Sequence, residues 1–324
     1  MVVDLKNADG LDMVRRLVSD ADVVIQNFRP GALAKLGLGY DDVRALNPDV
    51  IYASISGYGA DGPNSGRRVY DNVIQAASGL ASVQADPATG VPQVFRTLLC
   101  DKTTAYTVTQ AVTAALFARA TGRAGGQHLE VAMLDTAIAF LWPDSAMDAS
   151  LLDDDVMRAP TIAANYRVTT LADGYGSAAA VTDDEFVGLC ATLGCPELAD
   201  DPRYADTPSR MANAPSMVEA ITAAAAKCSL EDFVGRSAIH DVPASPVNSL
   251  DDLPTDPQVV HNEVFVTREH PLAGTIREPR PAARYSATPQ RVSDPAPAFG
   301  AHTDEVAAEL GLDPAALRAS GAIA

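Results

Sequence analysis

Three short apolar segments, separated by longer helical patterns, constrain the fold of this chain more than any other feature. Residues 21–26, 50–56 and 127–132 have the length and β-branched content of strands. Residues 9–19, 41–46, 103–120 and 134–142 carry apolar side chains at helical spacing. Helices that alternate with strands favour a sheet of parallel strands. We therefore expect an α/β fold with a doubly wound, largely parallel sheet.

A different pattern begins near Asn165 and predicts a smaller α+β domain. Residues 166–181 are typical of a hairpin, and helical patterns follow at 183–193, 216–227 and 230–237. Eight prolines then fall between residues 243 and 289, which favours a long extended return segment. We expect a large domain of residues 1–150 and 290–324, a small domain of residues 165–245, and linkers at 151–164 and 246–289.

One carboxylate, Asp101, stands between an apolar run and the helical pattern of residues 103–120. This is the place of an N-cap or first-turn residue, and aspartate is among the commonest caps. A carboxylate near the positive end of a helix also stays ionised and can act as a covalent nucleophile in a partly dry pocket. Both readings, cap and nucleophile, are compatible with this stretch.

Two loops follow predicted strands, where open α/β sheets bind ligands. Residues 27–31 contain proline and glycine, and residues 57–63 are rich in glycine. The second loop lacks the Gly-Lys-Ser/Thr ending of a phosphate-binding loop, and Pro63 excludes a dinucleotide fingerprint. Arg67 and Arg68 come next, and they are either phosphate ligands or a solvated surface pair.

Composition narrows the class of partner. The 324 residues include 47% hydrophobic residues and carry a net charge of −18, which argues against nucleic acid or an anionic membrane. No secretory signal pattern and no long apolar run is present, so we expect a cytoplasmic protein. Cys100, Cys190, Cys195 and Cys228 lack paired spacing, so reduced thiols and no metal site are expected.

Several separated motifs occur in an order that is specific as a set. They are ADVVIQNFRPG at 21–31 with LGLG at 36–39, LNP at 46–48, SISGYG at 54–59, YD at 70–71 with QA at 75–76, CDK at 100–102, GGQHLEV at 125–131 and GAHTDE at 300–305. With them the chain resembles the family III CoA-transferases. These include formyl-CoA:oxalate and carnitine CoA-transferases, and α-methylacyl-CoA racemases are their relatives.

The resemblance implies a role for particular residues. Asp101 matches the catalytic aspartate, and Asn27, Phe28 and Lys35 match CoA-contacting positions, Lys35 standing where the oxalate enzyme has arginine. Arg68 matches a basic position near the nucleotide phosphates. Tyr70 matches a residue of the acyl site, and the loop residues Gly57, Tyr58 and Gly59 are candidates for the substrate pocket.

The resemblance also implies a reaction and an assembly. The expected activity moves CoA from an acyl-CoA to a free carboxylic acid through a covalent aspartyl intermediate on Asp101. Acyl-CoA and a small acid would be the partners, with no metal and no permanently bound cofactor. Family members form interlinked homodimers, in which each chain threads the ring of the other.

Two alternatives stay open. Acyl-CoA racemases use a histidine where this chain has Tyr70 and a glutamate where it has Thr182, with Asp183 and Asp184 adjacent. A tyrosine is a poor general base at neutral pH, so transfer is favoured over racemisation. Family members also begin some tens of residues earlier with a strand and a glycine-containing loop. A truncated relative that binds CoA without turnover is therefore the second alternative.

Overall fold

The computed structural model describes residues 1–158, 161, 163, 166–291 and 294–324. The chain forms two compact units, one of residues Met1–Ala163 and Ala296–Ala324 and the other of Ala164–Pro295. Each unit has its own core, and the two are described separately.

The first unit is built on a parallel sheet. Strands β1 (Val23–Gln26), β2 (Ile51–Ser56) and β3 (Gln127–Ala132) pair in that order, with Gln26 opposite Ser54 and Ser54 opposite Glu130. Helix α2 (Tyr40–Leu46) connects β1 to β2, and the long helix α5 (Leu99–Ala120) precedes β3. The predicted parallel sheet is thus confirmed, whereas the doubly wound arrangement stays a prediction.

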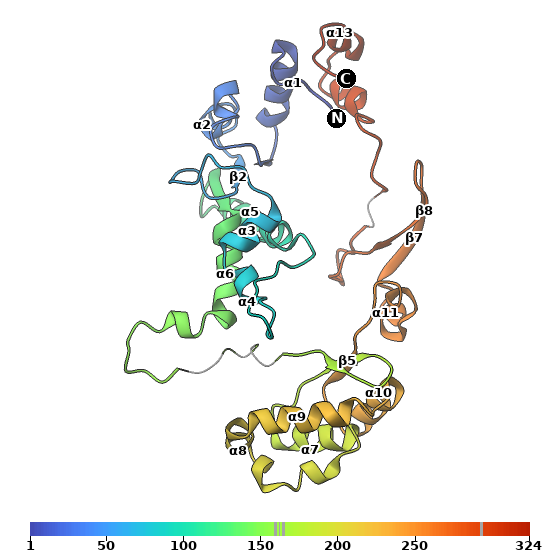
Figure 1. Ribbon diagram of the computed structural model, residues 1–324. Helices are drawn as coiled ribbons and strands as arrows, with labels where there is room; N and C mark the ends of the chain where they lie inside the picture. The colour runs from blue at the N-terminus through green and yellow to red at the C-terminus, as the bar shows by residue number, and fades with distance from the viewer. Residues whose placement is uncertain (159–160, 162, 164–165, 292–293) are drawn as a thin grey trace. The chain divides into compact units, whose positions relative to one another are not determined.

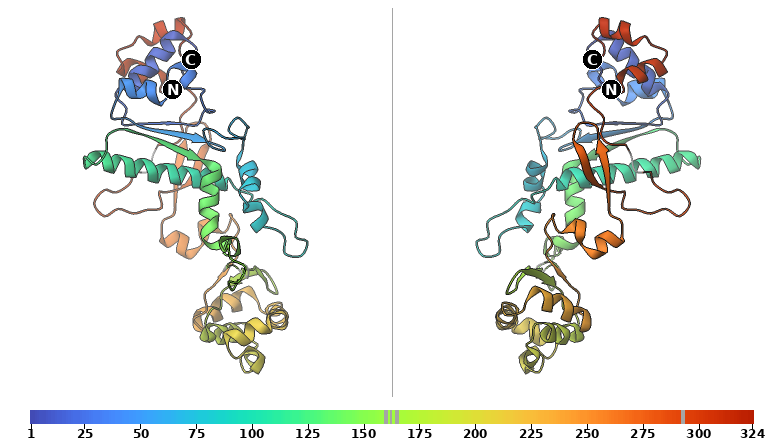
Figure 2. Two further views of the ribbon diagram at one scale, coloured as in Figure 1. Left: turned by 90° about the vertical axis from the view of Figure 1, so that its left-hand side faces the viewer. Right: turned by 90° about the vertical axis from the view of Figure 1, so that its right-hand side faces the viewer.

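Helix α5 runs along the sheet and contacts both β2 and β3, and Figure 2 shows it as the long teal helix. Helices α3 (Asp71–Ala77), α4 (Leu80–Val83) and α6 (Met133–Ser145) pack with it around a core that includes Ile74, Cys100 and Ala137. In Figure 1, α3 and α6 lie beside α5. This core holds the first turn of α5, which carries Asp101, against α3.

The two ends of the first unit are joined. Helix α1 (Ala8–Ser19) packs through the fully buried Met13 against α12 (Thr303–Glu309) and α13 (Pro314–Ala319). Residues Val3 and Ile323 form an antiparallel bridge, and both termini lie near α13 in Figure 1.

Strand β1 is only half-buried. Ile25 is 55% exposed, and among the described residues β1 pairs with β2 alone. An apolar run of this length does not distinguish a central strand from an edge strand, because both have the same side-chain pattern.

The second unit has antiparallel pairing and a helical core. Strands β4 (Thr169–Thr170), β5 (Tyr175–Ala178) and β6 (Ala244–Pro246) form one sheet. Helices α7 (Asp183–Thr192), α8 (Thr207–Ala212), α9 (Ala214–Ala225) and α10 (Leu230–Ile239) enclose Phe186, Tyr204 and Phe233.

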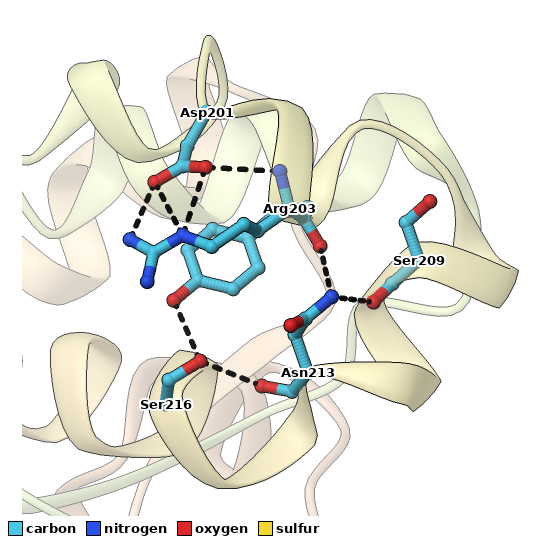
Figure 3. Close-up of polar contacts among 6 residues, drawn as sticks. Asp201, Arg203, Ser209, Asn213 and Ser216 are labelled. Carbon is cyan, nitrogen blue, oxygen red and sulfur yellow. Dashed lines mark hydrogen bonds and ion pairs between the residues drawn. The ribbon is translucent and has the colours of Figure 1, made fainter.

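A polar network ties the segments before α8 and α9 together (Figure 3). Arg203 pairs with Asp201, and the amide of Asn213 donates to the carbonyls of Arg203 and Ser209 at 3.2 and 2.9 Å. The Tyr204 hydroxyl meets the Ser216 hydroxyl at 3.0 Å. These contacts satisfy the polar end of a buried tyrosine and are structural.

The segment 246–289, expected to be an extended linker, carries regular structure instead. It contains α11 (Pro257–His261) and a hairpin of β7 (Phe265–His270) and β8 (Gly274–Pro279). Three of its prolines fall at the ends of these elements or between them: Pro257 begins α11, Pro271 lies in the hairpin turn and Pro279 ends β8. Proline is tolerated at such positions, so its density did not exclude a hairpin.

Candidate functional site

Asp101 lies in the first turn of α5, as the sequence predicted. The residue is exposed, whereas Cys100 before it is fully buried. The N-cap residue is Leu98, whose side chain makes no capping hydrogen bond. The first turn of a helix has backbone N–H groups without an intrahelical partner, so another group has to accept from them.

That group is Asp71, the first residue of α3. Its Oδ2 accepts a hydrogen bond from the backbone N–H of Asp101 at 2.9 Å. Asp71 is only 5% exposed. Its other oxygen, Oδ1, accepts from the amide of Gln75 at 2.5 Å. Asp71, and not Asp101, therefore occupies the capping position that the first turn of α5 offers.

Gln75 extends this arrangement to the loop before α5. The residue is 1% exposed, and its amide also donates to the carbonyls of Phe95 and Thr97 at 3.2 and 3.1 Å. The side-chain oxygen of Gln75, Oε1, accepts from the Phe95 N–H at 2.8 Å. One buried side chain thus fixes α3, the loop 95–97 and, through Asp71, the turn that carries Asp101.

The electrostatics of Asp101 differ from the expectation of a dipole-stabilised carboxylate. Burial and then the negative charge of Asp71 raise the pKa of Asp101 above its ordinary value. Burial, followed by the charges of Asp71 and Asp101, raises the pKa of the Cys100 thiol to about 11. Asp101 is therefore a more basic carboxylate than an ordinary aspartate, beside a thiol that is protonated at neutral pH.

A pocket of about 540 Å³ opens on one face of the parallel sheet, beside the loops that follow β1 and β2. Its polar lining comes from adjacent strands and includes Gln26, Ser54, His128 and Glu130. The Ser54 hydroxyl lies 2.8 Å from Nε2 of His128, and the His128 ring stacks on Tyr40 at 4.7 Å between centroids. The pocket lies where ligands bind in α/β sheets, and it is polar enough to hold a polar ligand.

The predicted site residues divide into groups in the structure. Phe28, which is 50% exposed, and Gly59 line the pocket. Asn27 lies in the same loop as Phe28 and is exposed, as is Lys35 in the 3-10 helix Ala34–Leu36. The pocket lining does not include Asp101, Lys35 or Arg68.

Other predicted residues lie beside the core that contains Ile74 and Cys100. Tyr58 packs on the core that contains Cys100, and a Cβ added to Gly57 would lie 2.4 Å from Val69 Cγ2. Tyr70 immediately precedes Asp71 and is 78% exposed, and Arg68 two residues earlier is exposed too. The loop 57–59 and Tyr70 thus adjoin the α3–α5 core.

Asp71 and Gln75 were part of a family motif in the sequence, but no role was predicted for either. Their spacing of four residues at the start of a helical pattern was the available signal, since such pairs share a helix face. Nothing in the pattern indicated that this pair reaches a residue thirty positions later.

Thr182 has a structural role in the second unit. It is the N-cap of α7: its hydroxyl accepts from the Glu185 N–H at 3.2 Å, and Glu185 Oε2 accepts from the Thr182 N–H at 2.9 Å. This capping box accounts for both side chains. Asp183, the next residue, pairs with the buried Arg210.

The described residues contain no group of three or more His, Cys, Asp or Glu placed to hold a metal ion. All four cysteines are free and buried. Within the described part of the chain, no helix is both long and apolar enough to cross a bilayer.

Comparison with known proteins identifies the class to which this arrangement belongs. The family model described as CoA-transferase family III matches residues 1–303. The chain is 36% identical to the succinate–glutarate CoA-transferase of Agrobacterium fabrum, over 96% of this chain and 78% of the relative. It is 30% identical to the human succinyl-CoA:glutarate CoA-transferase, over 96% of this chain and 71% of the relative.

A solved structure gives the same result. The crystal structure of a CAIB/BAIF family protein from Brucella suis matches with a TM-score of 0.80 and 30% identity, over 95% of this chain and 80% of that one. The chain therefore belongs to CoA-transferase family III. Its activity is the transfer of CoA from an acyl-CoA thioester to a carboxylic acid, which confirms the family and the activity expected from the sequence.

Proposed function

We propose that Asp101 carries this transfer as a covalent nucleophile. The observation that carries the proposal is the position of its carboxyl group: it is exposed at the start of α5 while its backbone is anchored to the buried Asp71. A fixed backbone with an accessible carboxylate suits a group that has to attack a carbonyl and be attacked in turn.

The reaction then proceeds through two kinds of aspartyl species. The Asp101 carboxylate attacks the acyl-CoA carbonyl, the C–S bond breaks, and a mixed anhydride and CoA thiolate form. The thiolate attacks the aspartyl carbonyl, which releases the donor acid and leaves an aspartyl-CoA thioester. The acceptor carboxylate attacks this thioester, and the expelled thiolate takes the acceptor acyl group and restores Asp101. No net proton is consumed.

CoA binding is proposed for the exposed basic and aromatic residues of the first unit. Asn27, Phe28 and Lys35 would contact CoA beside the sheet pocket, and Arg68 would meet a phosphate. Arginine and lysine donate charge-assisted hydrogen bonds to phosphate, and an exposed phenylalanine offers a stacking face. Tyr70, Gly57, Tyr58 and Gly59 would line the acyl site.

Dicarboxylic acids are the proposed substrate class. The Agrobacterium relative is named for succinate and glutarate, and the human relative for succinyl-CoA and glutarate. Succinyl-CoA as donor with glutarate as acceptor is therefore the first pair to assay.

A homodimer is also proposed. Tyr106 and Phe117 of α5 and Phe140 and Trp142 of α6 are between 47% and 77% exposed in the single chain. Large exposed apolar side chains on neighbouring helices are typical of an interaction surface. This supports a second copy as partner and is compatible with the interlinked arrangement implied by the family.

Trapping the intermediate tests the proposal. The protein is incubated with succinyl-CoA, treated with hydroxylamine or borohydride, digested, and analysed by mass spectrometry. We expect a hydroxamate or a reduced side chain at Asp101, and its loss in Asp101→Asn together with at least about a thousandfold loss of transfer. Asp9→Asn, which changes an exposed first-turn carboxylate of α1, is the matched control. An adduct elsewhere, or full transfer by Asp101→Asn, contradicts the proposal.

A further inference from the structure

We propose that Asp71, itself held by Gln75, is the residue that positions the nucleophile Asp101 for attack. The inference rests on the proposed function of Asp101 and adds two residues to the transfer machinery. Neither touches the reacting atoms in this arrangement, so both are positioning residues.

Hydrogen bonds to both carboxylate oxygens fix the orientation of the Asp71 side chain. Oδ2 accepts from the Asp101 N–H and Oδ1 from the Gln75 amide, at 2.9 and 2.5 Å. The direct bond to the nucleophile is to its backbone, so it fixes the Cα of Asp101 while the carboxyl group stays free. A displacement of about 1 Å at such a position can cost about a hundredfold in rate.

Gln75 makes the arrangement rigid. Its amide contacts the Phe95 and Thr97 carbonyls as well as Asp71, and its carbonyl takes the Phe95 N–H. The loop that delivers the chain into α5 is therefore fixed by the side chain that also orients Asp71. This almost fully buried side-chain amide is costly to replace, because its loss takes a hydrogen-bond donor from the buried Asp71 carboxylate.

A purely structural cap would not need a second negative charge. A serine, threonine or asparagine side chain can accept from a first-turn N–H, and none of them would repel a carboxylate beside it. Asp71 is 5% exposed and acts on Asp101 electrostatically as well as through the backbone. Its charge makes Asp101 more basic, and a more basic carboxylate is a better nucleophile as long as it remains ionised.

Other charged groups around α5 are directed elsewhere. Lys102 donates to the Thr97 hydroxyl at 2.9 Å, and Cys100 is a buried thiol. On the elements that pack against α5, Asp135 of α6 and Glu130 and His128 of β3 line the sheet pocket. Tyr58 packs on the α3–α5 core, and Tyr70 is exposed. Among the residues that the structure describes, Asp71 of α3 is the charge that raises the pKa of Asp101, after the effect of burial.

The test compares four variants, Asp71→Asn, Asp71→Glu, Gln75→Leu and Thr104→Val, with the wild-type protein. Asp71→Asn keeps the size and one acceptor but removes the charge, and Gln75→Leu removes the amide at similar size. The matched control is Thr104→Val, because Thr104 is a 3% exposed polar residue of α5 whose hydroxyl donates to the Cys100 carbonyl at 2.7 Å. Circular dichroism and urea unfolding establish that each variant is folded. Readouts are the single-turnover rate of adduct formation at Asp101, its pH profile, and KM for succinyl-CoA.

We expect Asp71→Asn and Gln75→Leu to slow adduct formation about ten- to a hundredfold, with KM changed less than about threefold. Because Asp71 raises the pKa of Asp101, its neutralisation lowers that pKa, so the acid limb of the Asp71→Asn profile shifts to lower pH. Asp71→Glu, which keeps the charge, retains the wild-type acid limb. Thr104→Val is less stable but forms the adduct at the wild-type rate.

Two results would overturn the inference, and both differ from the result that would overturn the proposed function. If the wild type forms the adduct and Asp71→Asn and Gln75→Leu match it in rate and pH profile, Asp71 and Gln75 do not position Asp101, and the nucleophile stands. A slowed rate in Thr104→Val equal to that of Asp71→Asn would show a general loss of helix stability instead. If the wild type forms no adduct at Asp101, the proposed function itself is wrong.

Discussion

Asp101 and Cys100 follow one another in the first turn of α5, yet their side chains meet different surroundings. Asp101 is exposed beside Asp71, whereas Cys100 is fully buried in the core between α3 and α6. A pKa of about 11 keeps the Cys100 thiol protonated at neutral pH, and only above that pH would it become a thiolate.

We therefore expect Cys100→Ala to keep the covalent adduct at Asp101 and to transfer CoA within about threefold of the wild-type rate, since the thiol takes no part. The cavity left behind should lower the free energy of unfolding by about 1 kcal/mol. Adduct mass spectrometry, transfer assays and urea unfolding measure the two effects. Rapid alkylation of Cys100 in the native protein, with loss of the adduct in the variant, would instead make the thiol the nucleophile.

The sequence predicted that Asp101 lies in the first turn of a helix, but it did not predict the raised pKa of its carboxyl group. The helical pattern after residue 102 predicts a first-turn position, and that is what α5 shows. The pattern carries no information on which other chain segment accepts from that turn. Asp71 reaches it from α3 because the α3–α5 core forms, and such a contact depends on packing across thirty residues.

At the scale of elements, one close approach sets the path of the chain into β3. A Cβ on Gly126 would lie 2.4 Å from the Pro48 carbonyl oxygen and 2.6 Å from the Asp49 carbonyl carbon. Both neighbours are backbone atoms, so neither can move without shifting the start of β2. The glycine at this position is needed for the β2–β3 pairing that begins with Ile51 opposite Gln127.

Gly126→Ala should accordingly lower the free energy of unfolding by about 1–3 kcal/mol, from overpacking against backbone. Gly125→Ala is its matched control, because there the nearest atom is Asp49 Oδ1 at 3.6 Å, an ordinary contact. Its effect should stay within about 0.5 kcal/mol. Urea unfolding measures the free energy of unfolding of both variants. Equal values for Gly126→Ala and Gly125→Ala would show that β2 and β3 tolerate a wider spacing than the structure has.

Strand and helix positions in the first unit were largely predictable, because apolar periodicity and glycine or proline breaks coincide there. The segments 23–26, 51–56 and 127–132 are strands, and 99–120 is a helix. The β7–β8 hairpin was not predicted, since its turn and ends carry the prolines that suggested an extended linker. Pairing between strands depends on hydrogen bonds that a local pattern does not specify.

At the scale of the whole molecule, the exposed aromatic residues of α5 and α6 lead to a prediction about assembly. Light scattering after size-exclusion chromatography should give about twice the chain mass of 33.8 kDa. If the chains are interlinked, dilution should not release monomers, because separation requires one chain to open. A fully active species of single-chain mass would exclude the proposed homodimer.

The contacts between residues 2–7 and 303–323 have a consequence for biosynthesis. The Val2 N–H donates to the Thr303 hydroxyl at 3.0 Å, and the Asp4 N–H donates to the Ala322 carbonyl at 2.9 Å. Met13 is buried by α12 and α13. On the ribosome, these partners are made after residues 164–295. Residues 164–295 form a continuous segment that can complete its core during translation. The apolar face of α1 therefore stays uncovered while residues 164–295 are made, and it is covered only when α12 and α13 follow.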